Sequence, residues 1–166
     1  MKYSKVIFLL SVVAISFSVS CSQQSVQEST QLESKELETI FPQGDKGPSK
    51  FFTGNAYNYG LVPMDSTFTT LVGNVYFEPG ARSNWHTHQA GQILIITDGV
   101  GYHQIEGEPI QVMKKGDVVK CPPNVRHWHG ASPDTGLQQL YIVPNTEKGV
   151  VNWMEAVSDE QYNKVE

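Results

Sequence analysis

The sequence predicts an all-β domain, built as a sandwich or a barrel, that begins near Phe51 and continues toward the C-terminus. Short runs rich in β-branched and aromatic residues alternate with turns made of Gly, Pro, Asn and Asp, which is typical of closely spaced strands. No long stretch has helical periodicity before the last residues of the chain. The chain of 166 residues is long enough for one such domain with a substantial core.

The predicted elements follow one another with little chain between them. The strands are runs of β-formers bounded by turn residues, and they cover residues 68–77, 92–97, 100–105, 110–113, 117–120 and 137–143. Turn residues separate them at 78–80, 98–99, 106–109, 115–117 and 122–124. A short helix is expected near the end, between Trp153 and Tyr162.

The first residues have the pattern of a signal peptide. Lys2 and Lys5 form a short positive region, and residues 6–19 follow as an apolar stretch that is short for a membrane span. Small residues precede Cys21, as in a bacterial lipobox, in which the cysteine receives a lipid after cleavage. Residues 1–21 are therefore predicted to be a lipoprotein signal peptide, and the protein an exported, periplasm-facing lipoprotein of the cell envelope, held at the membrane by this anchor alone. Ordinary cleavage beside an incidental cysteine is the alternative.

The rest of the chain divides into a tether and one domain. Residues 22–48 are rich in Ser, Gln, Glu and Lys, which predicts a flexible tether, and residues 49–166 form the predicted domain. Once Cys21 carries a lipid, Cys121 has no partner, so Cys121 is interpreted as a small buried hydrophobic residue. The formal net charge of -5 argues against a nucleic-acid partner.

Four of the five histidines fall in two tight pairs, His86/His88 and His127/His129. Residues two apart on a strand face the same way, so His86 and His88 present two imidazoles together, which suits a first-row transition metal. Gln92 opens the next apolar run, where its amide oxygen can complete the set, and His127 comes from a later strand. A hydrogen-bonded polar core without a metal is the alternative.

The spacing of these residues forms two blocks. One runs Gly80, His86, His88, Gln92, Gly99, and the other runs Gly116, Pro122, Asn124, His127. Both blocks resemble the two motifs of the cupin superfamily, which implies a cupin double-stranded β-helix (jelly-roll) barrel, here with a short C-terminal helix. The sequence departs from the usual cupin residues at Gln92, Asn124 and Ala131, where cupins more often carry Glu, Gly and Asn.

A longer signature is similar to small bacterial cupins that include manganese-dependent hydroxynitrile lyases. It comprises residues 75–82, 85–88, 91–92, 116–119, 127–131, 153–155 and 159–162. This likeness implies one divalent metal ion on His86, His88, Gln92 and His127, with manganese first; ligand type alone also admits iron, nickel, cobalt and zinc. An amide in place of a carboxylate leaves the site more positive, which strengthens the metal as a Lewis acid and weakens its retention.

The same likeness bears on catalysis. The lyases carry a histidine and a glutamine on the last barrel strand, and these positions match Gln139 and Val143, neither of which can act as a general base. His129 and Gln139 are the candidate catalytic residues of the pocket, and packing of His129 near the barrel mouth is the alternative. Gly73 is expected to leave room for substrate, or else to mark a bulge.

Other residues have simpler interpretations. His103 is predicted to lie on the surface, and Trp85 and Trp128 to point away from the lumen into core or subunit contacts. Arg82 is expected to be exposed or paired with a carboxylate; steering of an anionic substrate is the alternative.

The sequence therefore predicts a metal-dependent enzyme that acts as a Lewis acid on a small carbonyl or hydroxy substrate. An iron-dependent dioxygenase and a non-catalytic lipoprotein that binds a small ligand or metal are the alternatives. A homo-oligomer is expected, because related cupins form dimers and tetramers and because association covers barrel edges.

Overall fold

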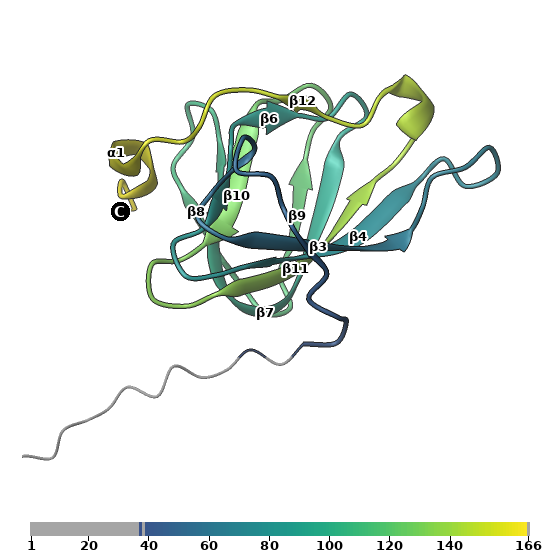
Figure 1. Ribbon diagram of the computed structural model, residues 1–166. Coiled ribbons are helices and arrows are strands. Elements are labelled where there is room, and N and C mark those ends of the chain that lie inside the picture. The colour runs from purple at the N-terminus through teal and green to yellow at the C-terminus, as the bar shows by residue number, and fades with distance from the viewer. Residues whose placement is uncertain (1–36, 38, 166) are drawn as a thin grey trace, which may run out of the picture. The chain divides into compact units, whose positions relative to one another are not determined.

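The strands of the protein pair into one curled antiparallel sheet (Figure 1). The computed structural model describes Leu37 and residues 39–165, and within this part of the chain twelve strands belong to the sheet. Their order along the main path is β1-β3-β4-β11-β7-β10-β5-β2, and every pairing is antiparallel. The predicted all-β cupin-type fold is therefore confirmed.

The strands are β1 Asp45–Lys46, β2 Phe52–Thr53, β3 Ala56–Val62, β4 Leu71–Phe77, β5 Arg82–Ser83, β6 His86–Thr87, β7 Gln92–Ile105, β8 Gln111–Lys114, β9 Val118–Cys121, β10 His127–Ala131, β11 Leu137–Val143 and β12 Asn152–Trp153. A 3-10 turn, η1, covers Thr146–Lys148, and the helix α1 covers Asp159–Tyr162. The short C-terminal helix is thus present. A capping box made by Ser158 and Gln161 fixes its start.

The strand β7 belongs to both halves of the sheet. Its first part pairs with β9 and β11, and its second part pairs with β8 and β10. Between them lies Gly99, with φ +82°, beside a shift in the register with β11. The buried face changes there from the even-numbered residues up to Asp98 to the odd-numbered Gly101 and His103. The turn predicted at 98–99 is therefore a bend inside one strand, and the two predicted strands are continuous.

Besides the two-residue strands β1, β2, β5, β6 and β12, two longer strands were missing from the sequence-based set. The strand β3 contains Asn58 and Gly60, which disfavour strands, and its pairing with β4 overrides these preferences. The strand β10 carries the second histidine pair and is buried on both faces. Short β1 lies within the range predicted as a tether, and its residues pair with Tyr57 and Asn58.

Apolar side chains form two clusters. The larger fills the lumen and includes Phe77, Leu94, Ile96, Met113 and Leu137. The smaller lies outside β10, where Trp85 and Trp128 pack with Val157 and Tyr162 of the C-terminal segment. The two tryptophans thus point away from the lumen into core packing, as the alternation along the strands predicted.

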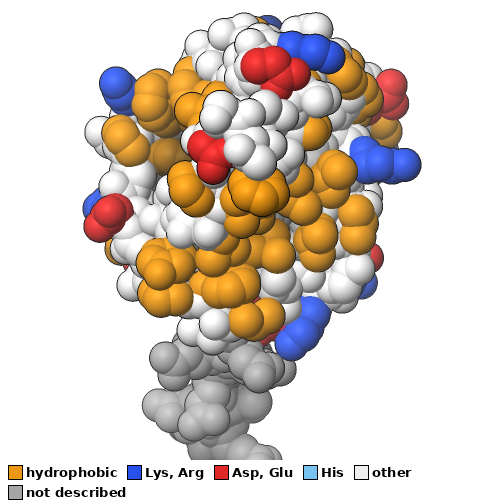
Figure 2. Space-filling model, turned by 90° about the vertical axis from the view of Figure 1, so that its right-hand side faces the viewer, with side chains coloured by type: hydrophobic (Ala, Val, Ile, Leu, Met, Phe, Trp, Pro, Cys, Tyr) orange, Lys and Arg blue, Asp and Glu red, His pale blue; other side chains and the backbone are white. Residues whose placement is uncertain are grey.

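Some large apolar side chains remain exposed. They include Val62, Met64 and Phe68 in and beside the loop that joins β3 to β4. Figure 2 shows that hydrophobic side chains gather on the face that lies at the right of Figure 1. Among the described residues there is no helix long and apolar enough to cross a membrane. The predicted signal peptide and Cys21 lie outside the described residues.

Candidate metal centre and its pocket

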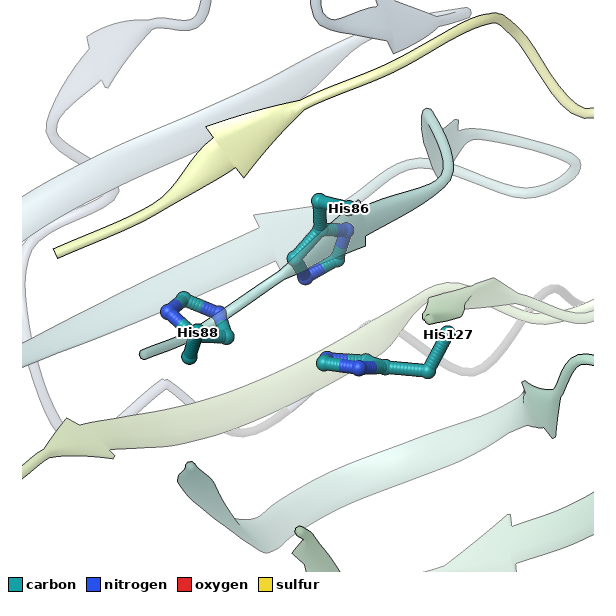
Figure 3. Close-up of side chains that lie close together, drawn as sticks. All are labelled: His86, His88 and His127. Atoms are coloured by element: carbon teal, nitrogen blue, oxygen red, sulfur yellow. The ribbon is translucent and has the colours of Figure 1, made fainter. Parts of the chain in front are cut away.

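Three of the four predicted metal ligands form one buried cluster. His86 on β6 and His127 on β10 are cross-strand partners, and His88 follows β6 directly. The three rings point toward a common space (Figure 3), and one ring nitrogen from each lies within 4.8 Å of the others. Each side chain is almost completely buried. The spacing in the sequence thus brought together the residues that it predicted.

Backbone carbonyls fix which nitrogen of each ring carries the proton. His86 Nδ1 lies 2.9 Å from the Asn84 carbonyl, His127 Nδ1 lies 2.9 Å from the Val125 carbonyl, and His88 Nδ1 lies 2.5 Å from the Val150 carbonyl. Because a carbonyl oxygen only accepts, each Nδ1 must donate, and each Nε2 keeps a free lone pair. This is the arrangement that holds histidine ligands in place around a metal ion.

The donor set fits a divalent cation. His88 Nε2 is buried and has no hydrogen-bond partner within the described part of the chain. Gln92 Oε1, which only accepts, lies 3.3 Å from His127 Nε2, which also has only a lone pair to offer. In this orientation both atoms could bind a cation placed between them, whereas without one a half-turn of the amide turns the contact into a hydrogen bond. Gln92 therefore lies where the prediction placed a fourth ligand.

Electrostatics keep these imidazoles neutral. Burial, together with the neighbouring imidazoles, holds the pKa of His86 well below its usual value of 6.5. Burial also lowers the pKa of His88, and it lowers that of His127 to about 3. A metal ion binds the neutral form of histidine, so the three ligands need not lose a proton at neutral pH.

A tight turn joins the ligands on either side of it. Gly91, at φ +81°, donates its N–H to the His88 carbonyl at 3.1 Å and so directs Gln92 into β7. The same carbonyl accepts the N–H of Asn124 at 2.8 Å. Asn124 has φ 60°, the left-handed conformation that asparagine tolerates better than most residues. This explains how Asn124 replaces the glycine more usual at this position.

His129 and Gln139 meet beside the metal ligands. Gln139 Nε2 lies 2.8 Å from His129 Nδ1, and the His129 ring lies 5.2 Å from that of His86 between ring centroids. Both side chains are buried, and burial holds the pKa of His129 well below 6.5. The structure therefore places the two candidate catalytic residues together, with His129 neutral and its Nε2 not engaged by Gln139.

A cavity of about 310 Å³ opens onto this centre. Its polar lining at the metal end is His86, His88, Gln92 and His129. Its walls are mainly aromatic and aliphatic and include Phe51, Phe52, Val75, Phe77, Val143 and Trp153. No Lys, Arg, Asp or Glu of the described residues lines it. The pocket thus favours a small uncharged ligand.

Two sequence-based expectations need correction, and both concern the lumen. His103 is buried rather than on the surface, because the bend in β7 turns it inward, 3.3 Å from Cys121 Sγ. The space above Gly73 holds the Tyr141 side chain, so this glycine makes room for a protein residue. Cys121 itself is buried as predicted, and burial raises the pKa of its thiol to about 12.

Arg82 pairs with a carboxylate, as predicted. Its side chain is buried, donates to the Val157 carbonyl and pairs with Asp159 at 2.5 Å. The burial of the side chain is an addition to that prediction. Arg82 does not line the pocket and so takes no part in steering a substrate into it.

Comparison with known proteins agrees with this fold. The family model described as the cupin domain matches residues 73–143. A protein of Granulicella tundricola named (R)-mandelonitrile lyase is 43% identical over 119 residues, which cover 72% of this chain and 91% of that protein. A cupin-like protein from Thermotoga maritima has 48% identity and a TM-score of 0.74, over 78% of this chain and 98% of the other.

A more distant structure shows the same fold. A conserved Klebsiella pneumoniae protein with a double-stranded β-helix domain has a TM-score of 0.53 at 16% identity, over 71% of this chain and 98% of that one. The fold and the histidine cluster define a barrel protein with one candidate metal site. The chain belongs to the cupin family, and within it the chain is similar to the Granulicella protein named (R)-mandelonitrile lyase.

Proposed function

We propose that the protein is a divalent-metal-dependent enzyme that acts on a small, uncharged carbonyl or hydroxy compound. The observation that carries this proposal is the convergence of three neutral histidines and Gln92 on one space at the end of a mainly apolar pocket. The name of the Granulicella relative makes mandelonitrile, a cyanohydrin, the first substrate to test. Manganese is the metal that the family likeness favours.

The metal ligands and the pocket have separate tasks. His86, His88, Gln92 and His127 would hold the ion, which supplies a Lewis acid that stabilises negative charge on a substrate oxygen. The apolar walls exclude water from the reacting oxygen and so strengthen every electrostatic interaction there. Phe77 packs edge-on against His129, with ring centroids 5.7 Å apart, and limits the movement of that imidazole.

His129 and Gln139 would handle the proton. In the described orientation the Gln139 amide donates to His129 Nδ1, so the proton of the ring is on Nε2 and can be donated to a substrate oxygen. A half-turn of the amide presents Oε1 to Nδ1 instead, and Nε2 then accepts a proton. Gln139 thus permits both tautomers of His129: with its own proton on Nδ1, the ring can take up the proton of a cyanohydrin hydroxyl at Nε2 as the bond to cyanide breaks, and the imidazolium can then give that proton to the departing cyanide.

The test combines metal analysis with turnover. The protein is purified without a histidine tag or chelator, its metal content is measured, and benzaldehyde release from mandelonitrile is followed after loading with manganese or iron. We expect about one ion per chain. His127→Ala should lose the ion and at least about 100-fold in turnover, since it removes a ligand. His103→Gln is the matched control, because it changes a buried histidine outside the ligand set.

The outcomes separate the alternatives. Turnover that is unchanged in His127→Ala contradicts the proposal. Oxygen uptake that depends on added iron, without cyanohydrin cleavage, would identify an oxygenase instead. Tight retention of metal and of a small ligand without any turnover would identify a binding protein.

The N-terminal sequence and the barrel edges support three further proposals about the setting of this function. Export, a lipid anchor at Cys21 and assembly into a homo-oligomer stay predictions. Mass measurement of the membrane-extracted protein tests the anchor, and light scattering tests the oligomer.

A further inference from the structure

The pocket carries a second group of polar atoms away from the histidines. Asn58 on β3 and Tyr141 on β11 both line it, and the Asn58 amide lies near enough to the Tyr141 hydroxyl to oppose, in part, the rise in its pKa that burial causes. Asn58 is exposed and Tyr141 is half-buried, so this pair lies where the cavity meets solvent. Between the pair and the metal centre the wall includes Val75 and Val143.

The position of the Tyr141 hydroxyl is set by a glycine. Tyr141 is the cross-strand partner of Gly73 on β4, and its ring leans over that residue so closely that a methyl group on Gly73 would overlap the hydroxyl. The ring therefore points from β11 toward β4, away from β7, which carries Gln92. A side chain at position 73 would displace the phenol. Glycine at this position therefore allows Tyr141 to lie where it does.

The strand order gives the approximate length of the pocket across the sheet. The strand β11 lies between β4 and β7, so Gly73 and Leu94, the two partners of Tyr141, are two strand spacings apart, which is about 10 Å across the sheet, and Gln92 lies two residues further along β7. This length suits a six-membered ring that carries one oxygen toward the histidines and a second polar substituent toward Tyr141. A ligand of this shape would lie against Val75 and Val143 along its length.

We propose that Tyr141, supported by Asn58, is a specificity-determining residue that hydrogen-bonds a polar group at the far end of the substrate. The substrate class is then a small, uncharged ring compound with a hydroxyl or similar group opposite the carbon that bears the reacting oxygen. This inference rests on the proposed function for the location of the reacting oxygen. Tyr141 and Asn58 offer both donors and acceptors, so a substrate hydroxyl finds a partner in either direction.

The test compares two alcohols of nearly equal size, para-hydroxybenzyl alcohol and para-methylbenzyl alcohol. Their dissociation constants for the metal-loaded protein are measured by calorimetry, with the fluorescence of Trp153 in the pocket wall as a second readout. We expect the hydroxyl compound to bind about tenfold more tightly, which is the effect of one neutral hydrogen bond. Tyr141→Phe should remove most of this preference and leave the affinity for the methyl compound unchanged.

Tyr59→Phe is the matched control. Tyr59 neighbours Asn58 on the same strand, faces the other side of the sheet and does not line the pocket, so the preference should survive its loss. Equal binding of the two alcohols by the unaltered protein, or a preference that persists in Tyr141→Phe, would overturn the inference.

The metal content and mandelonitrile turnover of the unaltered protein are measured on the same samples. If metal and turnover are present but the preference is absent, only the inference about Tyr141 fails. If the preference depends on Tyr141 but no metal or turnover is found, the proposed function fails and Tyr141 remains a ligand-binding residue.

Discussion

At Gln92, a single side chain sets the charge of the whole metal centre. Its amide oxygen lies 3.3 Å from His127 Nε2, within the group of neutral imidazoles. Among the described residues, no carboxylate lines the pocket, so the full charge of a bound ion would act on the substrate. An ion bound here would therefore be held less firmly, and it would attract a substrate oxygen more strongly, than one bound beside a carboxylate.

Gln92→Glu tests both the retention of the metal and its strength as a Lewis acid. The added carboxylate should slow loss of the metal to a chelator by about 10-fold or more, because it supplies a charged ligand. It should also lower turnover, because the ion becomes a weaker Lewis acid. Competition with a chromogenic chelator measures the first effect. Asn152→Asp, which makes the same change of charge at an exposed position of β12, should alter neither quantity. Faster loss of metal from Gln92→Glu than from the unaltered protein would contradict this expectation.

At the scale of the elements, the turn between His88 and Gln92 determines whether the ligands converge. Gly91 has φ +81°, and a Cβ there would lie 2.7 Å from the Cys121 carbonyl oxygen, a backbone atom of β9. Gly80 has nearly the same φ, +77°, but open space around the position of a Cβ. Comparing alanine substitutions at the two glycines therefore distinguishes the effect of backbone strain from the effect of steric crowding.

Gly80→Ala should destabilise the protein by about 1 kcal/mol, from the left-handed conformation alone. Gly91→Ala should be worse by at least about 1 kcal/mol, and it should weaken metal binding because Gln92 must move. Urea unfolding and metal titration of both variants provide the measurement. Equal effects of the two substitutions on metal binding would show that the turn does not position Gln92.

The C-terminal segment is a second element on which the site depends. Arg82 connects the barrel to it: Nε and Nη2 donate to the Val157 carbonyl at 3.2 and 3.0 Å, and the guanidinium lies 4.5 Å from the centroid of the Tyr162 ring. The Asp159 side chain that pairs with Arg82 is 87% exposed, so water screens this ion pair. The carbonyl contacts therefore contribute more to stability than the salt bridge does.

Arg82→Met should destabilise the fold by about 2–3 kcal/mol, because it leaves a buried carbonyl without its partner. Asp159→Asn should cost less than about 1 kcal/mol. The free energy of unfolding in urea distinguishes the two. If both substitutions had the same effect, the ion pair rather than the carbonyl contact would hold the segment.

The elements also show what local sequence can predict. Alternation along a strand, a local property, was sufficient to predict that His86 and His88 face the same way, whereas the resemblance to the cupin motifs predicted that His127 joins them. His103 was misplaced because its facing depends on a one-residue change of phase at Gly99, which pairing with β11 imposes from a distant part of the chain. Tyr141 was missed for a related reason, because its role depends on a glycine across the sheet.

At the scale of the whole molecule, the barrel interior contains five buried histidines that are neutral in the folded state. His86, His88, His103, His127 and His129 are all buried, and all have pKa values below 6.5 in the folded state, about 4 for His103 and about 3 for His127. Burial is the main cause in every case. The unfolded chain therefore takes up protons at a pH where the folded chain does not.

The metal-free protein should accordingly lose stability as the pH falls. The contribution of these histidines is fully present above the unfolded pKa of about 6.5 and is lost as the pH falls from there toward 4. His103 alone accounts for roughly 3 kcal/mol of this loss. Urea unfolding across this range, in the presence of a chelator, measures it. In His103→Gln the free energy of unfolding should depend less steeply on pH. An unchanged dependence would contradict the assignment of this loss to His103.

The hydrogen bond from His88 to the Val150 carbonyl ties a predicted metal ligand to a residue 62 positions later in the sequence. Next to it, β12 pairs with β6, which carries His86 (Figure 1). During biosynthesis these predicted ligands therefore reach their final orientation only after synthesis has passed Trp153. If the chain is exported, as its N-terminal sequence predicts, and folds only afterwards, the ion would be captured where folding finishes. Metal supply outside the cytoplasm, more than the affinities of the ligands, would then decide which element the barrel acquires.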